Sequence, residues 1–193
     1  MNNSLWLDPV PLRLQDKARQ SFQKGDVVGF LGRASNECSL MLVWNNLGLL
    51  RQRGIYEEAL LHAITATRTN NHGFGREALE ILLRIADKAK LLAAGDPMPG
   101  PGPFTLYRGV AGNTNARRIR GISWTSTLER ATWFANRFPI LANPSVYKAE
   151  VEAAHILAYV GSHRNEDEYI VRLPPSVKVE RLKTATPRCQ QVG

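Results

Sequence analysis

A short stretch rich in proline and glycine interrupts the chain near its middle. Residues 95–103 read Gly-Asp-Pro-Met-Pro-Gly-Pro-Gly-Pro. Proline lacks the backbone N–H donor, and glycine loses more conformational entropy than any other residue when it is ordered, so a helix cannot continue through this stretch. We therefore expect a helical region over residues 1–95, a linker over residues 96–103 and a second region over residues 104–193.

The residues before this boundary follow a helical pattern. Residues 56–67 and 79–89 each place their apolar side chains at three- and four-residue spacing, which puts them on one face of a helix. The polar sequence of residues 70–73 separates these two helices. Residues 40–50 predict a third, largely buried helix, and residues 14–22 suggest a fourth.

The residues after the boundary favour strands. Tyr147, Ala149 and Val151 alternate with charged residues, as expected of a half-buried antiparallel strand. One helix is expected from about residue 128 to residue 138. The predicted strands cover residues 104–110, 121–125, 146–152, 156–160, 166–173 and 177–182. The chain is thus expected to be an α+β protein, with a helical region followed by a small mixed, mostly antiparallel sheet that carries helices.

Composition narrows the class of protein. With 193 residues and 44% hydrophobic residues, the chain can bury a real core. Cys38 and Cys189 lie far apart and have no metal-like spacing with the four histidines, so we expect neither a disulfide framework nor a metal site. No run approaches the roughly 18 apolar residues that a membrane span needs, and no export signal opens the chain. We expect a soluble cytoplasmic protein that makes no membrane contact. Its net charge of +8 mildly favours a polyanionic partner.

Three short motifs stand out in the second half, in this order: Leu106-Tyr107-Arg108-Gly109, Ser123-Trp124-Thr125 and Glu166-Asp167-Glu168-Tyr169. Their order and spacing resemble those of the R-S-E class of mono-ADP-ribosyltransferases, a class that includes many bacterial toxins. The resemblance covers residues 104–182 and does not reach the helical half. It implies an enzyme that takes NAD as a substrate, uses no metal, and transfers ADP-ribose to a macromolecular acceptor. It also allows an effector that is delivered into the cytoplasm of a target cell.

The first motif suits the pyrophosphate of NAD. An arginine fork can hold phosphate oxygens at two points, so Arg108 is the candidate ligand, with Tyr107 beside it. Gly109 would let the backbone approach a bound ligand closely.

The second motif can be aligned in two registers, residues 123–125 or residues 125–127. We prefer the first, because the helix that follows then opens at Ala131 as it does in the family. In that register the resemblance implies that Ser123 holds the catalytic glutamate by a hydrogen bond and that Thr125 lines the NAD site. Trp124 replaces the usual middle residue, and it either shapes the nicotinamide pocket or belongs to the core.

The third motif carries the chemistry. On a strand, Glu166 and Glu168 would point to the same face, because side chains alternate with a period of two. Loss of nicotinamide builds positive charge on the ribose, which a carboxylate stabilises. The resemblance implies that this carboxylate is Glu168. Glu166 would then orient or deprotonate the acceptor.

The helix after the second motif offers two further ligands. By resemblance, Phe134 and Arg137 occupy the positions of an aromatic and an arginine that embrace the nicotinamide and the phosphates. The helical spacing of Trp133, Phe134 and Phe138 instead favours packing against the sheet. Arg137 could equally favour its helix C-terminus, where positive charge is stabilised.

Several functional readings stay open at this stage. We expect the acceptor to be a protein side chain, arginine first. A base of RNA or DNA is the alternative that the positive charge favours. A plain NAD glycohydrolase and an inactive NAD-binding interaction module remain as further alternatives. The N-terminal helices would brace the core, cover the cleft or bind a neutralising partner protein.

Overall fold

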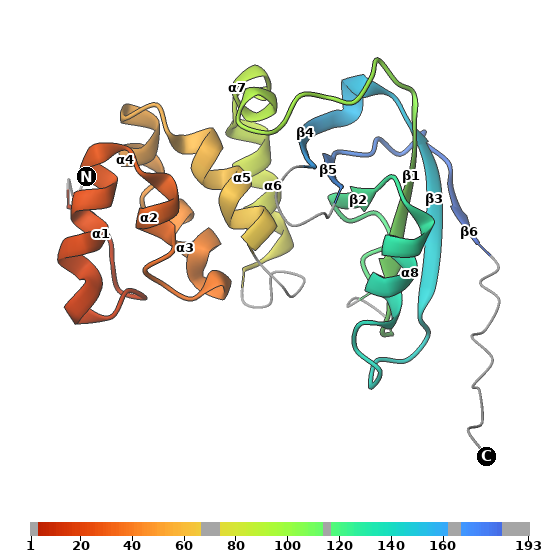
Figure 1. Cartoon of the computed structure of the whole chain (residues 1–193), viewed down its shortest axis with the longest axis horizontal. Coiled ribbons are helices and arrows are strands. Elements are labelled where there is room, and N and C mark those ends of the chain that lie inside the picture. The colour runs from red at the N-terminus through yellow and green to blue at the C-terminus, as the bar shows by residue number, and fades with distance from the viewer. Residues whose placement is uncertain (1–3, 67–73, 114–116, 162–166, 183–193) are drawn as a thin grey trace. The chain divides into compact units, whose positions relative to one another are not determined.

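The structure, a computed structural model, describes residues 4–66, 74–113, 117–161 and 167–182. The chain divides into two compact units, Met1–Gly95 and Asp96–Gly193 (Figure 1). The division falls inside the proline- and glycine-rich stretch, where neither a helix nor a strand is formed.

The first unit is built from helices. Its elements are α1 (Leu12–Lys24), α2 (Val27–Leu31), the 3-10 turn η1 (Asn36–Cys38), α3 (Ser39–Asn45), α4 (Leu47–Gln52), α5 (Tyr56–Ala66), α6 (Arg76–Ile85) and α7 (Lys88–Ala93). Helix α1 ends at Gly25, whose φ of 74° gives the left-handed cap that glycine adopts without strain. Asp26 then begins α2, since its carboxylate accepts from the Gly29 amide at 2.8 Å. Phe30 of α2, Leu60 of α5 and Leu82 of α6 are fully buried.

The predicted helix over residues 40–50 is in fact two helices, α3 and α4, because Asn46 interrupts it. The side chain of Asn46 is buried and donates to the carbonyl oxygens of Trp6 and Leu42, both at 2.9 Å. It also accepts from the Trp6 amide at 2.8 Å. A buried amide must satisfy its donors and acceptor, and here it does so by tying the N-terminal segment to the break between the helices.

The predicted helix over residues 79–89 is also two, α6 and α7, with the break at Ala86 and Asp87. The Asp87 carboxylate accepts from the amides of Ala89 and Lys90 at 2.9 and 3.1 Å. Glu57 accepts from the Asp87 amide at 3.0 Å. An N-cap of this kind starts a new helix and stabilises it by about 1 kcal/mol.

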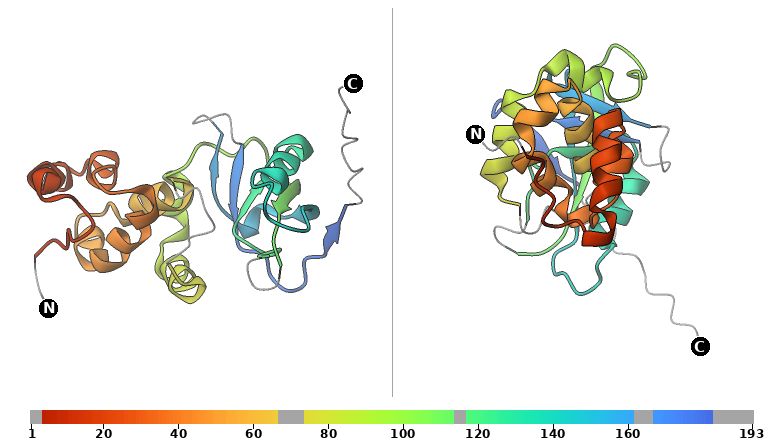
Figure 2. Two further views of the ribbon diagram at one scale, coloured as in Figure 1. Left: turned by 90° about the horizontal axis from the view of Figure 1, so that it is seen from below. Right: turned by 90° about the vertical axis from the view of Figure 1, so that its left-hand side faces the viewer.

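The described part of the second unit forms a six-stranded sheet, and a helix packs against it (Figures 1 and 2). Its elements are β1 (Phe104–Val110), β2 (Ser123–Thr125), α8 (Leu128–Asn136), β3 (Ser145–Val151), the 3-10 turn η3 (Ala153–His155), β4 (Ile156–Val160), β5 (Glu168–Val171) and β6 (Val179–Arg181). The strand order is β4-β5-β2-β1-β3-β6, and each described pair is antiparallel. The expected α+β architecture is confirmed, whereas the mixed pairing that was expected is not found among the described strands.

The two faces of the sheet carry different side chains. One face holds the larger apolar cluster, which includes Leu106, Trp124, Tyr169 and Val151. The other face receives α8, which packs Ala131 and Ala135 against it. Among the described residues, none of the helices has both the length and the apolar character that crossing a bilayer requires.

Candidate active site

A single row of side chains crosses the sheet and contains parts of all three sequence motifs. Directly opposed residues of an antiparallel pair project from the same face. Val160 opposes Glu168, Glu168 opposes Thr125, Thr125 opposes Tyr107, and Tyr107 opposes Lys148. Strand pairing therefore aligns Glu168, Thr125 and Tyr107 on one face, which is the face that α8 covers at one end.

Ser123 and Glu168 are brought together by the pairing of β2 with β5. Ser123 lies two residues before Thr125, so it is the diagonal neighbour of Glu168 on the same face. The Ser123 hydroxyl donates a hydrogen bond to Glu168 Oε1. Both side chains are half-buried. This contact holds the glutamate side chain in one direction.

Arg108 reaches Ser123 from the opposite face of the sheet, because it opposes Tyr147 of the larger apolar cluster, whereas its neighbours Tyr107 and Gly109 lie on the face that carries Glu168. Its Nε donates to the carbonyl oxygen of Arg118 at 2.9 Å, and its Nη1 donates to the carbonyl oxygen of Ser123. Ser123 is thus the middle member of the site: its carbonyl accepts from Arg108 and its hydroxyl donates to Glu168.

The charge of Arg108 is stabilised by Glu168 against the cost of burial. Burial lowers the pKa of Arg108 to about 10, while the Glu168 carboxylate acts in the opposite direction. The guanidinium is therefore still charged at neutral pH. Gly121 packs against it, since a Cβ there would lie 2.5 Å from the Arg108 Cζ. The two described bonds make Arg108 a brace for the backbone at Arg118 and at Ser123, the first residue of β2. Phosphate chemistry alone did not predict this role.

Trp124, the middle residue of the second motif, belongs to the core. It is 2% exposed, and its indole N–H donates to the carbonyl oxygen of Gly121 at 2.7 Å. Strand alternation places it on the opposite face from Ser123 and Thr125. The tryptophan therefore leaves the face that carries Glu168 unchanged.

The alternative register of the second motif has a different geometry. The Ser126 hydroxyl donates to Asp167 Oδ2, whereas Ser123 donates to Glu168. Thr125 is buried, and its Oγ1 accepts from the Thr127 amide at 3.4 Å, in the turn that leads into α8. The first register is the one in which a motif hydroxyl meets Glu168.

Glu166 lies outside the described residues. The strand expected over residues 166–173 covers only Glu168–Val171. Asp167 has a φ of 47°, in the left-handed region, so the extended backbone begins at Glu168. The predicted shared face of Glu166 and Glu168 stays a prediction, because Glu166 is not among the described residues.

Gly109 serves helix packing. A Cβ there would lie 2.6 Å from the Ala135 amide nitrogen and closer still to the Ala131 carbonyl oxygen. Tyr107, on the same face, packs against the cluster that Ala131, Ala135 and Val146 form. The close backbone approach expected at Gly109 is thus made by α8, and the space next to this glycine is already filled.

The aromatic residues of α8, and Phe138 just after it, do not pack as their spacing suggested. Trp133 is 49% exposed and Phe138 is 40% exposed, because the small Ala131 and Ala135 face the sheet instead. Phe134 is half-buried and meets Trp133 edge-to-face at 5.0 Å. The Arg137 guanidinium lies 5.4 Å from the Trp133 ring and 5.2 Å from the Phe138 ring. Phe134 and Arg137 therefore belong to an aromatic and cationic group on the surface of α8.

Motif analysis missed the contacts of Tyr159, Arg117 and Arg120. The Tyr159 hydroxyl donates to Asp167 Oδ1 at 2.8 Å. Arg117 donates to the Tyr147 hydroxyl at 3.1 Å, and Arg120 donates to the Val177 carbonyl oxygen at 3.1 Å. These arginines brace loops, a role that no local pattern signals because the partners lie 30 and 57 residues away.

Within the described ranges, no group of three or more histidine, cysteine, aspartate or glutamate side chains could hold a metal ion. A scan against protein-family models, a search of curated proteins and a search of solved structures each found no match to this chain.

Proposed function

We propose that this protein is a mono-ADP-ribosyltransferase that cleaves NAD and transfers ADP-ribose to a macromolecular acceptor, as toxins and effectors of the R-S-E class do. The observation that carries the proposal is the double role of Ser123, which accepts from Arg108 through its carbonyl and donates to Glu168 through its hydroxyl. The three residues that define the R-S-E motif order are thereby in one bonded chain, although 60 residues separate the first from the last.

In the proposed reaction, the bond between ribose C1′ and the nicotinamide nitrogen breaks, and nicotinamide leaves with the bonding electron pair. The ribose then carries oxocarbenium-like positive charge. Glu168 stabilises this charge and accepts a hydrogen bond from the ribose 2-hydroxyl, as a carboxylate does in glycoside cleavage. Ser123 keeps the carboxylate in place, so little reorganisation is needed when the charge develops.

Arg108 contributes charge and geometry in this proposal. Two of its N–H groups hold the backbone at Arg118 and Ser123, and the guanidinium has further donors for the NAD pyrophosphate. A fixed fork is suited to this double task because it is planar and stays charged.

The acceptor supplies a nitrogen that forms the new bond to C1′ and gives up a proton. Glu166 is the base we assign to that proton, with a protein arginine as the first acceptor. A base in RNA or DNA is the second candidate, favoured by the exposed Trp133 and Phe138 with arginines over their rings. Aromatic faces interleaved with positive charge suit single-stranded nucleic acid.

The test uses the full chain with NAD labelled separately in nicotinamide and in adenine, together with a cell lysate. Release of free nicotinamide measures cleavage, and adenine label that becomes acid-precipitable measures transfer. Glu168→Gln should lower both by at least about a hundredfold, because it removes the charge but keeps the shape. The matched control is Glu152→Gln, an exposed glutamate just after β3. Equal turnover in the two variants would exclude Glu168 from the mechanism, and a wild-type protein that releases no nicotinamide would refute the function.

Digestion of the labelled product identifies the acceptor class. Label released by protease points to a protein, and label released by nuclease points to a nucleic acid. With a nucleic-acid acceptor, transfer should also fall steeply with salt, because counterions compete for the phosphates.

A further inference from the structure

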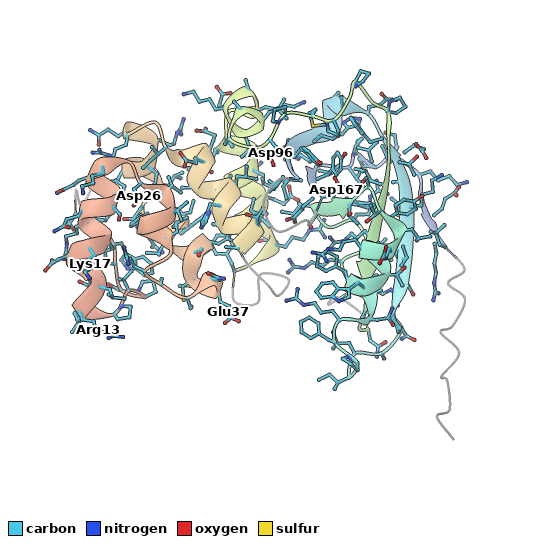
Figure 3. All side chains as sticks on the ribbon, in the orientation of Figure 1. Arg13, Lys17, Asp26, Glu37, Asp96 and Asp167 are labelled. Carbon is cyan, nitrogen blue, oxygen red and sulfur yellow. The ribbon has the colours of Figure 1, made fainter. Side chains whose placement is uncertain are left out.

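Asp167 stands between two hydroxyl donors from different strands, immediately before the proposed catalytic glutamate. Ser126, just after β2, donates to its Oδ2, and Tyr159 of β4 donates to its Oδ1 at 2.8 Å. Asp167 is labelled in Figure 3. Each oxygen of the carboxylate therefore has its own partner, so the side chain is held from both neighbouring strands of β5.

The backbone at Asp167 needs such support. Its φ of 47° is uncommon for a residue other than glycine, although aspartate is among the side chains that tolerate it best. A conformation of this kind persists only when its surroundings determine it. Here the two hydroxyl bonds hold Asp167 in this conformation. The extended backbone of β5 begins at the next residue, Glu168.

Tyr159 is itself placed with little freedom. Its ring lies 4.7 Å from the ring of Tyr169, its partner across the β4–β5 pair. Burial, and then the bond to Asp167, raise the pKa of Tyr159 to about 12, so the phenol remains a donor at neutral pH.

Two neighbours of Tyr159 restrict it further. The phenol ring of Tyr159 packs directly against Gly161, where a Cβ would lie only 2.6 Å from the Tyr159 Cζ. Asp96 closes the end of β4, since its amide donates to the Tyr159 carbonyl oxygen at 2.7 Å and its carboxylate accepts from the Gly161 amide at 2.8 Å.

We propose that Asp167, held by Ser126 and Tyr159, is a positioning residue that fixes the backbone from which Glu168 projects. The inference rests on the proposed function of Glu168. Two serines of one short segment then divide the work: Ser123 fixes the side chain of Glu168, and Ser126 fixes the residue before it. Neither Asp167 nor Tyr159 touches the reacting atoms in this arrangement.

Three variants remove the support in different ways. Tyr159→Phe deletes one donor and keeps the ring, and Ser126→Ala deletes the other. Asp167→Asn keeps a side chain that tolerates the left-handed backbone, but its amide nitrogen cannot accept one of the two hydroxyls. Ser126→Thr restores the hydroxyl and should rescue the alanine variant. Tyr56→Phe is the control, because it removes a buried tyrosine hydrogen bond of 2.8 Å, to the Leu82 carbonyl, in the other unit.

Two measurements are made on each full-length variant. For NAD cleavage, kcat should fall by about tenfold or more while KM changes by less than about twofold, since a small displacement of a catalytic group lowers turnover strongly. Amide hydrogen exchange, measured without NAD, should become at least about tenfold faster in residues 167–171 and stay unchanged in residues 104–110. Tyr56→Phe should change neither.

The proposal is overturned if kcat and local exchange in the variants match wild type. It is equally overturned if exchange rises uniformly across the sheet, because a general loss of stability would then explain the effect. If wild-type protein cleaves no NAD, the proposed function fails, and the exchange measurement still decides whether Asp167 and its partners order the start of β5.

Discussion

Gly109 of β1 lies directly under Ala131 of α8, so close that a Cβ on Gly109 would collide with the Ala131 carbonyl oxygen. This contact sets how near the helix approaches the sheet. It also selects the helix face that carries Ala131 and Ala135 for burial, which leaves the larger Trp133 at the surface.

Gly109→Ala should therefore destabilise the second unit. The colliding atoms belong to the backbone and cannot move aside by a rotamer change, so we expect a loss of at least about 2 kcal/mol. Urea unfolding monitored by circular dichroism measures it. Gly48→Ala in α4, where nothing lies within 4 Å of the added Cβ, should instead stabilise the chain by about 0.5–1 kcal/mol. Similar effects at both sites would contradict the close packing of α8.

Truncation of two tryptophans in the second unit should destabilise the protein by very different amounts. Trp124→Ala empties a core position that is 2% exposed and should cost about 3–5 kcal/mol. Trp133→Ala removes a side chain that is 49% exposed and should cost less than about 1 kcal/mol. Thermal unfolding compares the two variants, and a large loss at Trp133 would show that its ring is packed.

Ser123→Ala should reduce NAD cleavage more than Ser126→Ala does. Ser123 bonds the proposed catalytic carboxylate itself, and losing such a preorganised contact is worth about a hundredfold in turnover. Ser126 acts only through Asp167. Steady-state kinetics of the two purified variants give the ranking, and the reverse order would favour residues 125–127 as the motif.

An exposed cross-strand network should make part of the stability depend on pH. The hydrogen bond from Thr105, at 2.8 Å, and then the one from Lys148 lower the pKa of Glu150 below its ordinary value of 4.5. A lowered folded-state pKa stabilises the fold above the unfolded-state value, and this contribution is lost as pH falls through the folded-state pKa. The stability difference between wild type and Glu150→Gln should accordingly be constant at neutral pH and shrink below about pH 4.5.

The difference in unfolding free energy between wild type and Glu150→Gln is measured at about one pH value per unit between about pH 2 and pH 7. We expect it to be small because the pair is exposed and screened by solvent. Glu152→Gln, at a neighbouring exposed position, provides the comparison. A difference that grows as the pH falls would contradict the assigned sign.

Glu166→Ala should lower transfer of ADP-ribose far more than it lowers NAD hydrolysis. In the role assigned to it, Glu166 serves the acceptor, whereas water needs little help to capture the ribose cation. Both activities are measured side by side on one preparation. Equal losses would make Glu166 part of the NAD-cleaving machinery instead.

Local sequence patterns determined several features of this protein by themselves. The proline- and glycine-rich residues 95–103 mark the division between the two units, because their backbone chemistry excludes regular structure. Alternation in residues 146–152 predicted the strand β3, and Tyr147, Ala149 and Val151 are buried as expected. These features depend on residues a few positions apart, so propensity and periodicity are sufficient to show them.

Only the tertiary structure decided which side chains meet. Ser123 reaches Glu168 across 45 residues because β2 pairs with β5 in one register, and a shift of one residue would turn the glutamate to the other face. Helix α8 buries its alanines because Gly109 admits a close helix, so the aromatic spacing of the sequence pointed to the wrong face. The helix break at Asn46 depends on Trp6, which lies 40 residues away. Such contacts are set by long-range packing and hydrogen bonding, which the local pattern around either partner does not contain.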